Sequence, residues 1–298
     1  MVFRELLISM RPRQWSKNIF VFAGIVFSGE LFRKPLAFAE ALLAFAVFCM
    51  ASSSVYLIND LVDIERDRLH PTKCNRPLAA RRLDPRVALL AAVFLIVVAS
   101  PVAFLMNAYF GGVLVTYFIL MLAYTFFLKN IVIVDIFALA AGFVLRAAGG
   151  AVAIEVSISP WLLVCMTLLA LFLGLAKRRH ELLLLERGAS AHRTILKEYS
   201  AQLVEEMISI VTASTIMAYS LYTFFGAEWE TMPYRFTGQI PYMMVTIPFV
   251  MYGVFRYIYL VYRRNSGGSP EEILFGDLPF LINMVLWAVS VVVILYFV

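Results

Sequence analysis

The chain contains a series of long apolar runs, each of a length that can cross a lipid bilayer. A transmembrane helix needs about 20 predominantly apolar residues. Runs of this kind lie near residues 18–32, 36–58, 87–106, 109–128, 131–154, 160–176, 207–226, 240–262 and 278–298. Hydrophobic residues make up 62% of the chain and charged residues 15%, against roughly 45–50% and about 25% in soluble domains. We therefore predict an all-α fold, a polytopic membrane bundle of about nine transmembrane helices.

The basic residues are distributed unevenly over the predicted loops. Most of the 25 lysines and arginines lie in the N-terminal segment, in the loops at about 59–86 and 177–206, and in the other loops on the same side. The opposite side carries Arg33, Lys34 and Arg235. Because short cytoplasmic loops are enriched in Lys and Arg, we expect a multi-pass protein of a bacterial inner membrane with its N-terminus inside and its C-terminus outside. The net charge of +5 then reports topology and contact with anionic lipid, not binding of nucleic acid.

The two long charged loops follow the second and the sixth apolar run, four helices apart. This spacing suggests one transmembrane domain over residues 1–298, built from two four-helix halves and a last helix. The three cysteines, Cys49, Cys74 and Cys165, have no spacing typical of a zinc site or a disulfide framework.

Four polar residues, Asn59, Asp60, Asp63 and Asp67, lie where the second apolar run meets the cytoplasm. If the helix continues, offsets of three and four place the three aspartates on one face, with Asp60 about 10 Å from Asp67. Mg²⁺ prefers oxygen ligands, usually one or two carboxylates together with substrate phosphates and water. The segment therefore predicts a Mg²⁺ site that holds a diphosphate, with the active site on the cytoplasmic side.

A solvated acidic helix end is the alternative interpretation of this segment. Its place at the membrane boundary favours a functional role, because acidic side chains there are costly. Immediately downstream, Pro71 and Pro77 interrupt the helix, so we expect a bent loop that returns Lys73 and Arg76 toward the carboxylates. Cations beside a metal-binding acidic segment suit an anionic, metal-carrying substrate. The enrichment of cytoplasmic loops in basic residues explains the same cations without a site.

Cations elsewhere in the chain are further candidates for phosphate contacts. Lys17 precedes the first apolar run, and Lys129 lies between the fourth and the fifth. Arg146 lies within the fifth run with no acidic residue nearby. A charge at such a depth costs several kcal/mol unless it is paired or hydrated, so we expect Arg146 to face an interior cavity.

Residues 56–80 resemble the first aspartate-rich motif of the UbiA prenyltransferase superfamily. They read Tyr-Leu-Ile-Asn-Asp-Leu-Val-Asp-Ile-Glu-Arg-Asp-Arg-Leu-His-Pro-Thr-Lys over 56–73 and Asn-Arg-Pro-Leu-Ala-Ala over 75–80. The resemblance extends into the decaprenyl-phosphate phosphoribosyltransferase branch. That part rests on Arg-Pro-Arg-Gln-Trp-Ser-Lys-Asn over 11–18, Leu-Arg-Ala-Ala-Gly-Gly over 145–150 and Ala-Lys-Arg-Arg-His-Glu-Leu over 176–182. The chain departs from the usual motif at Cys74 and Arg81, where the superfamily pattern has Arg and Gly.

The resemblance implies a nine-helix bundle around a central cavity that acts on Mg²⁺-bound diphosphates. Members that prenylate aromatic rings have a second aspartate pair after the sixth span, where this chain has Lys177, Arg178, Arg179 and Glu181. Cations at that place fit a lipid phosphate as acceptor. The resemblance therefore implies transfer of a 5-phosphoribosyl group from phosphoribosyl diphosphate to polyprenyl (decaprenyl) phosphate, with release of pyrophosphate, in the synthesis of arabinose donors for the cell envelope.

Two other functions stay open. The first is a UbiA-type transfer of a prenyl group from a prenyl diphosphate to an aromatic or lipid acceptor. The second is a transporter, channel or scaffold without chemistry. At the end of the sixth run, a surface Lys177–Glu181 pair and arginines that extend to the membrane interface are the simpler interpretation.

Our expectation for the site joins the residue pattern and the resemblance. The cofactor is Mg²⁺, the partners are phosphoribosyl diphosphate, polyprenyl phosphate and membrane lipids, and a homo-oligomer is compatible with the sequence. We expect catalytic roles for Asp60, Asp63 and Lys177, metal contacts from Asn59, Asp60, Asp63 and Asp67, and substrate contacts from Lys17, Asn18, Lys73, Arg76, Lys129, Arg146, Arg178 and Glu181.

Overall fold

The computed structural model describes residues 2–32, 34–70, 73–186, 195, 198–225, 242–263 and 276–297. These residues form helices and turns, and they include no strand. In this part of the chain, eight helices are long and apolar enough to cross a membrane. Their bounds are Pro35–Val62, Pro85–Met106, Ala108–Phe126, Val134–Ala153, Pro160–Leu183, Ala201–Phe225, Tyr242–Tyr262 and Leu278–Phe297. The predicted all-helical membrane fold is confirmed.

The first expected span, residues 18–32, is not one long helix. A short α1 (Val2–Met10) leads into a 3-10 helix η1 (Pro12–Phe22) and then into the five-residue α2 (Ala23–Phe27). A 3-10 helix of 11 residues is unusual, because runs longer than three or four residues are uncommon. The other eight expected spans each correspond to one of the long helices.

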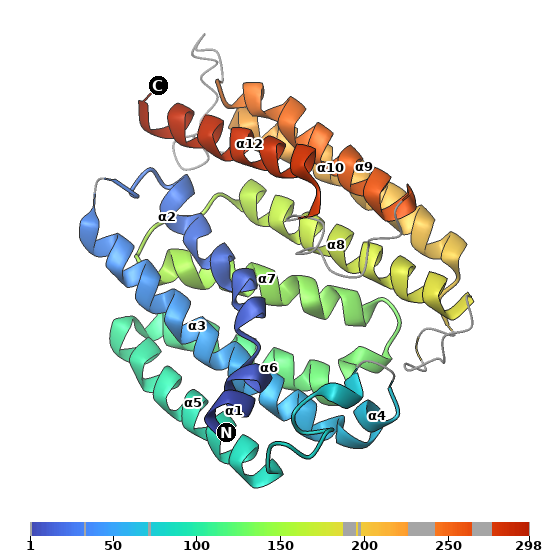
Figure 1. The fold of residues 1–298 in the computed structure, drawn as a ribbon. Coiled ribbons are helices and arrows are strands. Elements are labelled where there is room, and N and C mark those ends of the chain that lie inside the picture. The colour runs from blue at the N-terminus through green and yellow to red at the C-terminus, as the bar shows by residue number, and fades with distance from the viewer. Residues whose placement is uncertain are drawn as a thin grey trace. The chain divides into compact units, whose positions relative to one another are not determined.

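The chain divides into two compact units, Met1–Ser157 and Ile158–Val298. Figure 1 shows the helices of both along the chain. The first unit contains α1, η1, α2, α3 (Pro35–Val62), α4 (Ile64–Arg68), η2 (Lys73–Asn75), α5 (Pro85–Met106), α6 (Ala108–Phe126), η3 (Leu128–Asn130) and α7 (Val134–Ala153). The second contains α8 (Pro160–Glu186), α9 (Ala201–Phe225), η5 (Tyr242–Thr246), α10 (Ile247–Arg263) and α12 (Leu278–Phe297). The boundary falls between the fifth and sixth expected spans, so the two four-helix halves stay a prediction.

Helix α3 is the central element of the first unit, in contact with α5, α6, α7 and η1. Its alanines, of which Ala44 and Ala51 are fully buried, let the neighbouring helices approach closely. Phe48 fills the space between them, with its ring 5.9 Å from that of Phe110 and 5.4 Å from that of Tyr117. This packing fixes the position of the C-terminal end of α3, which carries the acidic segment.

The η1–α2 segment packs against α7 at backbone distance. A Cβ atom added to Gly150 would lie 1.8 Å from the carbonyl oxygen of Val21, and one added to Gly24 would lie 2.7 Å from Cα of Ala151. Only glycine leaves room for this approach. The sequence around Gly150 therefore holds the irregular segment in a fixed place beside α3 and α7.

The second unit is held together by polar contacts between apolar helices. Arg256 of α10 donates to both carboxylate oxygens of Asp277 at 3.0 and 2.9 Å, and Asp277 caps α12 by accepting from the amide of Phe280 at 3.0 Å. Trp287 of α12 donates to the hydroxyl of Tyr219 in α9 at 2.8 Å. These bonds link α9, α10 and α12.

Two glycine substitutions test the close packing of η1 and α2 against α7. We expect Gly150→Ala to destabilise the protein by about 1–3 kcal/mol, because the added methyl group overlaps a backbone atom and overpacking has this cost. Gly112 lies in α6 with nothing within 4 Å of an added Cβ. Gly112→Ala is therefore expected to stabilise its helix by up to about 1 kcal/mol. Thermal unfolding in detergent micelles measures both, and equal melting temperatures for the two variants would contradict the packing.

Candidate active site

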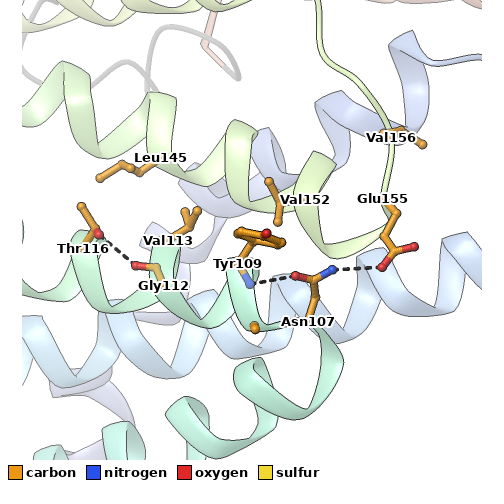
Figure 2. A pocket seen from close by; sticks show the side chains of 10 residues that line it. Asn107, Tyr109, Gly112, Val113, Thr116, Leu145, Val152, Glu155 and Val156 are labelled. Atoms are coloured by element: carbon orange, nitrogen blue, oxygen red, sulfur yellow. Dashed lines mark hydrogen bonds between the residues drawn. The ribbon is translucent and has the colours of Figure 1, made fainter.

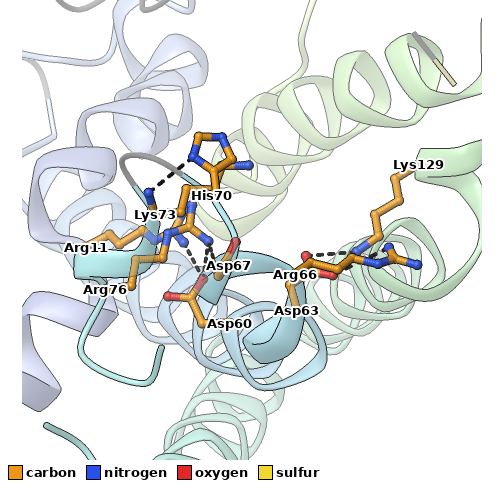
Figure 3. Close-up of polar contacts among 9 residues, drawn as sticks. All are labelled: Arg11, Asp60, Asp63, Arg66, Asp67, His70, Lys73, Arg76 and Lys129. Atoms are coloured by element: carbon orange, nitrogen blue, oxygen red, sulfur yellow. Dashed lines mark hydrogen bonds and ion pairs between the residues drawn. The ribbon is translucent and has the colours of Figure 1, made fainter. Parts of the chain in front are cut away.

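The acidic segment does not continue as one helix. Helix α3 ends at Val62, and Asp63 adopts φ −96° and ψ 9° before α4 begins at Ile64. The break turns Asp63 away from the other two carboxylates (Figure 3). The expectation that Asp60, Asp63 and Asp67 share one helical face is therefore wrong, because the helix changes direction at the middle aspartate.

Asp60 and Asp67 converge on a single guanidinium group. Nη1 of Arg76 lies 3.0 Å from Oδ1 of Asp60 and 2.6 Å from Oδ2 of Asp67. Asp60 is only 2% exposed and Asp67 only 4%. The expected return of the loop is thus confirmed for Arg76, which the turn at residues 73–80 brings back to the carboxylates. Pro71 and Thr72 lie outside the described residues.

Asp63 pairs with a cation from another helix. Nζ of Lys129 donates to its two carboxylate oxygens at 2.9 and 3.0 Å. Lys129 belongs to η3, between α6 and α7, and it is 8% exposed. Nη1 of the exposed Arg66 lies 3.9 Å from Oδ1 of Asp63, the same oxygen that Lys129 contacts. The described carboxylates of this segment are therefore each matched by a basic side chain.

Arg11 also reaches the site, a contact that the sequence alone does not predict. Its side chain donates to Asp60 and lies over the ring of Tyr56, with Cζ 5.0 Å from the ring centroid. Its backbone has φ 55° and ψ 62°, a left-handed conformation that costs about 1–2 kcal/mol for a residue with a Cβ atom. Its place in the Arg-Pro-Arg-Gln-Trp-Ser-Lys-Asn stretch was the one available signal.

Asn59 and Lys73 lie close to the other acidic-segment residues in the chain, whereas Lys17 belongs to a distant part of it. The carbonyl oxygen of Asn59 accepts from the amide of Asp63 at 3.0 Å. Lys17 lies half-buried in η1. The backbone amide of Lys73 donates to Nδ1 of His70 at 3.3 Å, so His70 holds the turn in which Lys73 lies (Figure 3).

Asn18 and Arg146 lie deeper in the first unit and bind each other. Nε of Arg146 donates to Oδ1 of Asn18 at 2.7 Å, and its two terminal nitrogens donate to the carbonyl of Gly142 at 2.8 Å and the hydroxyl of Tyr117 at 2.7 Å. Asn18 is fully buried and also donates to Ser52 of α3 at 3.2 Å. The intramembrane charge is thus stabilised by neutral acceptors, and the pair connects η1 to α7 and α3.

The residues at the end of α8 belong to the second unit. Lys177 is half-buried, and Arg178, 2% exposed, pairs with Glu181. Nε of Arg179 donates to Oε1 of Glu205 in α9 at 2.9 Å. Two of the three consecutive cations, Arg178 and Arg179, are thus paired with glutamates.

An open groove of about 830 Å³ lies between α6 and α7 (Figure 2). Its walls are mainly apolar, and the amide of Asn107 donates to Glu155 at its rim, at 3.0 Å. Glu155, at the rim of the groove, lies just after the C-terminal end of α7, whereas Lys129 lies before its N-terminal end. The rim and Lys129 are therefore at opposite ends of this helix. None of the residues that line the groove belongs to the acidic segment.

The chemistry of the acidic segment fits a divalent metal in part. In the described residues, no three His, Cys, Asp or Glu side chains are grouped as metal ligands. Two nearly buried carboxylates do meet at one positively charged nitrogen, and a hard divalent cation takes one or two carboxylates of this kind. Asp60 and Asp67 therefore provide the ligand type that Mg²⁺ prefers, and one oxygen of each lies within 3.0 Å of the same nitrogen, whereas Asp63 faces Lys129.

Comparison with known proteins agrees with the motifs. A family model described as the UbiA prenyltransferase family matches residues 18–276. A relative from Mycolicibacterium smegmatis, named decaprenyl-phosphate phosphoribosyltransferase, is 33% identical over 98% of this chain and 92% of its own length. A relative of the same name from Corynebacterium glutamicum is 31% identical over 98% of this chain and 86% of its own.

Solved structures share the fold. A UbiA homolog from Archaeoglobus fulgidus bound to GPP and Mg²⁺ has a TM-score of 0.72 and 18% identity, over 98% of this chain and 99% of that one. A UbiA homolog from Aeropyrum pernix K1 has a TM-score of 0.66 and 16% identity, over 94% of this chain and 98% of that one. Sequence motifs, family match and fold agree, and the chain is a multi-pass integral membrane protein that belongs to the UbiA prenyltransferase family.

Proposed function

We propose that this protein is a membrane-embedded transferase that moves a 5-phosphoribosyl group from phosphoribosyl diphosphate to a polyprenyl phosphate and releases pyrophosphate. The observation that carries the proposal is the convergence of two nearly buried carboxylates, Asp60 and Asp67, on one cationic atom. Such an arrangement suits a metal-bound diphosphate. The full-length similarity to two decaprenyl-phosphate phosphoribosyltransferases supports the phosphoribosyl group as the one transferred.

Asp60 and Asp67 are the residues that would hold Mg²⁺, with Asn59 orienting the segment, whereas Asp63 faces Lys129 and would hold that lysine in place. The ion, when bound, neutralises charge on the leaving pyrophosphate. Asp60 and Asp63 stay our catalytic assignments. Their role is to fix where the diphosphate binds, Asp60 as a nearly buried carboxylate and Asp63 through its ion pair with Lys129.

The basic residues around the carboxylates would bind the diphosphate oxygens. Arg76 and Lys129 lie at the acidic segment, Lys73 follows it in the chain, and Lys17 belongs to η1. Donors placed where negative charge develops stabilise the transition state most, because they need no reorganisation during the reaction. As the bond from C1 of the ribose to the pyrophosphate oxygen breaks, these groups stabilise the charge on the leaving group.

The acceptor needs no strong general base. A phosphate monoester is already ionised near pH 7, so its oxygen can attack C1 of the ribose directly. We propose that Lys177 and Arg178 bind this lipid phosphate, with Glu181 holding Arg178 in place through their ion pair.

Asn18 and Arg146 would affect the substrate indirectly, through the position of η1. Their side chains bind each other and the helices around them, so we propose that they keep η1, and with it Lys17, in place. The uneven distribution of basic loop residues supports a site on the cytoplasmic side of a bacterial inner membrane.

The donor and acceptor can be tested directly. Purified protein, given labelled 5-phosphoribosyl diphosphate, decaprenyl phosphate and Mg²⁺, is expected to form a labelled lipid and release pyrophosphate, and EDTA is expected to stop the reaction. Thin-layer chromatography of the lipid extract measures the product. Product formed only from a prenyl diphosphate and an aromatic acceptor would replace this proposal with prenyl transfer.

Substitution of the acidic residues tests their assignment. We expect Asp60→Asn and Asp67→Asn to lower turnover by more than about 100-fold, the usual scale for loss of one group that stabilises a charged transition state. Glu65→Gln is the matched control, because Glu65 lies in the same segment with its side chain 82% exposed. Turnover of the labelled donor is the measurement, with melting temperature to show that each variant is folded. Full activity of Asp60→Asn would remove the metal assignment.

A further inference from the structure

We propose that Arg11 is a pyrophosphate-binding residue and that Arg11 and Arg76 must exchange partners to bind that group. In this exchange each arginine leaves an aspartate for the pyrophosphate while a divalent metal takes its place on the carboxylates. The metal and pyrophosphate would therefore bind cooperatively, and each would bind weakly without the other. This inference rests on the proposed function and describes how the metal and the pyrophosphate bind to that site.

The metal and the two arginines compete for the same carboxylate oxygens. Arg11 and Arg76 both contact Oδ1 of Asp60, and Arg76 also contacts Oδ2 of Asp67 at 2.6 Å. These are the carboxylate oxygens that converge on one point. A metal that binds at that point must therefore displace the guanidinium groups from them.

A metal bound without an anion would leave the site with an unbalanced positive charge. Asp60 and Asp67 are nearly buried, whereas the side chains of Arg11 and Arg76 are 26% and 24% exposed. A metal that arrived alone would leave two guanidinium groups beside a dication with no anionic partner, which is unfavourable at this depth. Pyrophosphate supplies that partner, because arginine binds phosphate oxygens in a bidentate geometry. The favourable state thus contains both ligands.

The backbone of Arg11 is held in a strained conformation. Its left-handed backbone, φ 55° and ψ 62°, is a strained state that persists where the surroundings require it, and such residues cluster at ligand-binding sites. The guanidinium lies over the ring of Tyr56, one turn before Asp60 on α3. The ring face can support the cation whether it contacts the carboxylate or a phosphate, so the exchange needs only a small movement.

Binding measurements on the purified full-length protein test the exchange without an activity assay. Mn²⁺ replaces Mg²⁺ as the probe, and electron paramagnetic resonance reports free Mn²⁺ during titrations with and without inorganic pyrophosphate. Parallel titrations without protein determine the Mn²⁺–pyrophosphate complex in solution. We expect pyrophosphate to tighten Mn²⁺ binding by at least about tenfold, within the common range of coupling between two ligands, and Mn²⁺ to tighten pyrophosphate binding by the same factor.

Arg11→Asn is the decisive variant, because asparagine tolerates the left-handed backbone and carries no charge. We expect it to bind Mn²⁺ alone several-fold more tightly than the natural protein and to bind pyrophosphate in the presence of Mn²⁺ about tenfold more weakly. Opposite effects on two ligands are not expected from a purely structural role. Arg13→Asn, the same change at an exposed arginine of η1, is the control and should leave both affinities unchanged.

The outcomes separate the two proposals. If Mn²⁺ and pyrophosphate both bind but independently, or if Arg11→Asn weakens both, the exchange is wrong while the proposed function stands. If neither ligand binds the natural protein, the proposed function fails as well. If Arg11→Asn does not fold, the coupling between Mn²⁺ and pyrophosphate binding is measured in the natural protein and in Arg11→Lys. Absence of this coupling in the natural protein contradicts the exchange by itself.

Discussion

The negative charge at the end of α3 has to be neutralised where little water reaches it. Asp60 and Asp67 are nearly buried beside an apolar helix, and an unpaired carboxylate there would cost several kcal/mol. Arg76 satisfies both carboxylates, which requires the chain after α4 to turn back within a few residues. The loop that follows the helix is thus positioned by electrostatics, and the same arrangement places cations where a diphosphate would bind.

The packing inside the membrane serves this site. The η1–α2 segment brings Arg11 to the acidic segment, and it is held by the close approach of Val21 to Gly150 and by the bond between Asn18 and Arg146. An intramembrane arginine is expensive, so its bonds to neutral acceptors make the position of η1 specific. Irregular backbone within a membrane protein occurs where protein buries it, as here between α3 and α7.

Much of the fold follows from periodicity and composition, because span length and apolar runs are local properties. The return of Arg76 also followed, from the prolines beside it. The break at Asp63 did not, since no proline or glycine marks it and the packing of α4 decides it. Nor could spacing reveal that Arg11 meets Asp60 or that Asn18 meets Arg146, because both contacts join residues far apart in the chain whose meeting depends on how helices pack. The sequence therefore predicts which residues belong to the site better than it predicts which of them contact one another.

The most direct test of the account is a cryo-electron microscopy structure of the protein with Mg²⁺ and pyrophosphate. The account predicts an ion in contact with Asp60, Asp67 and the pyrophosphate, with the guanidinium groups of Arg11 and Arg76 moved onto phosphate oxygens. Pyrophosphate bound away from the acidic segment, with Arg76 still between the two aspartates, would contradict it.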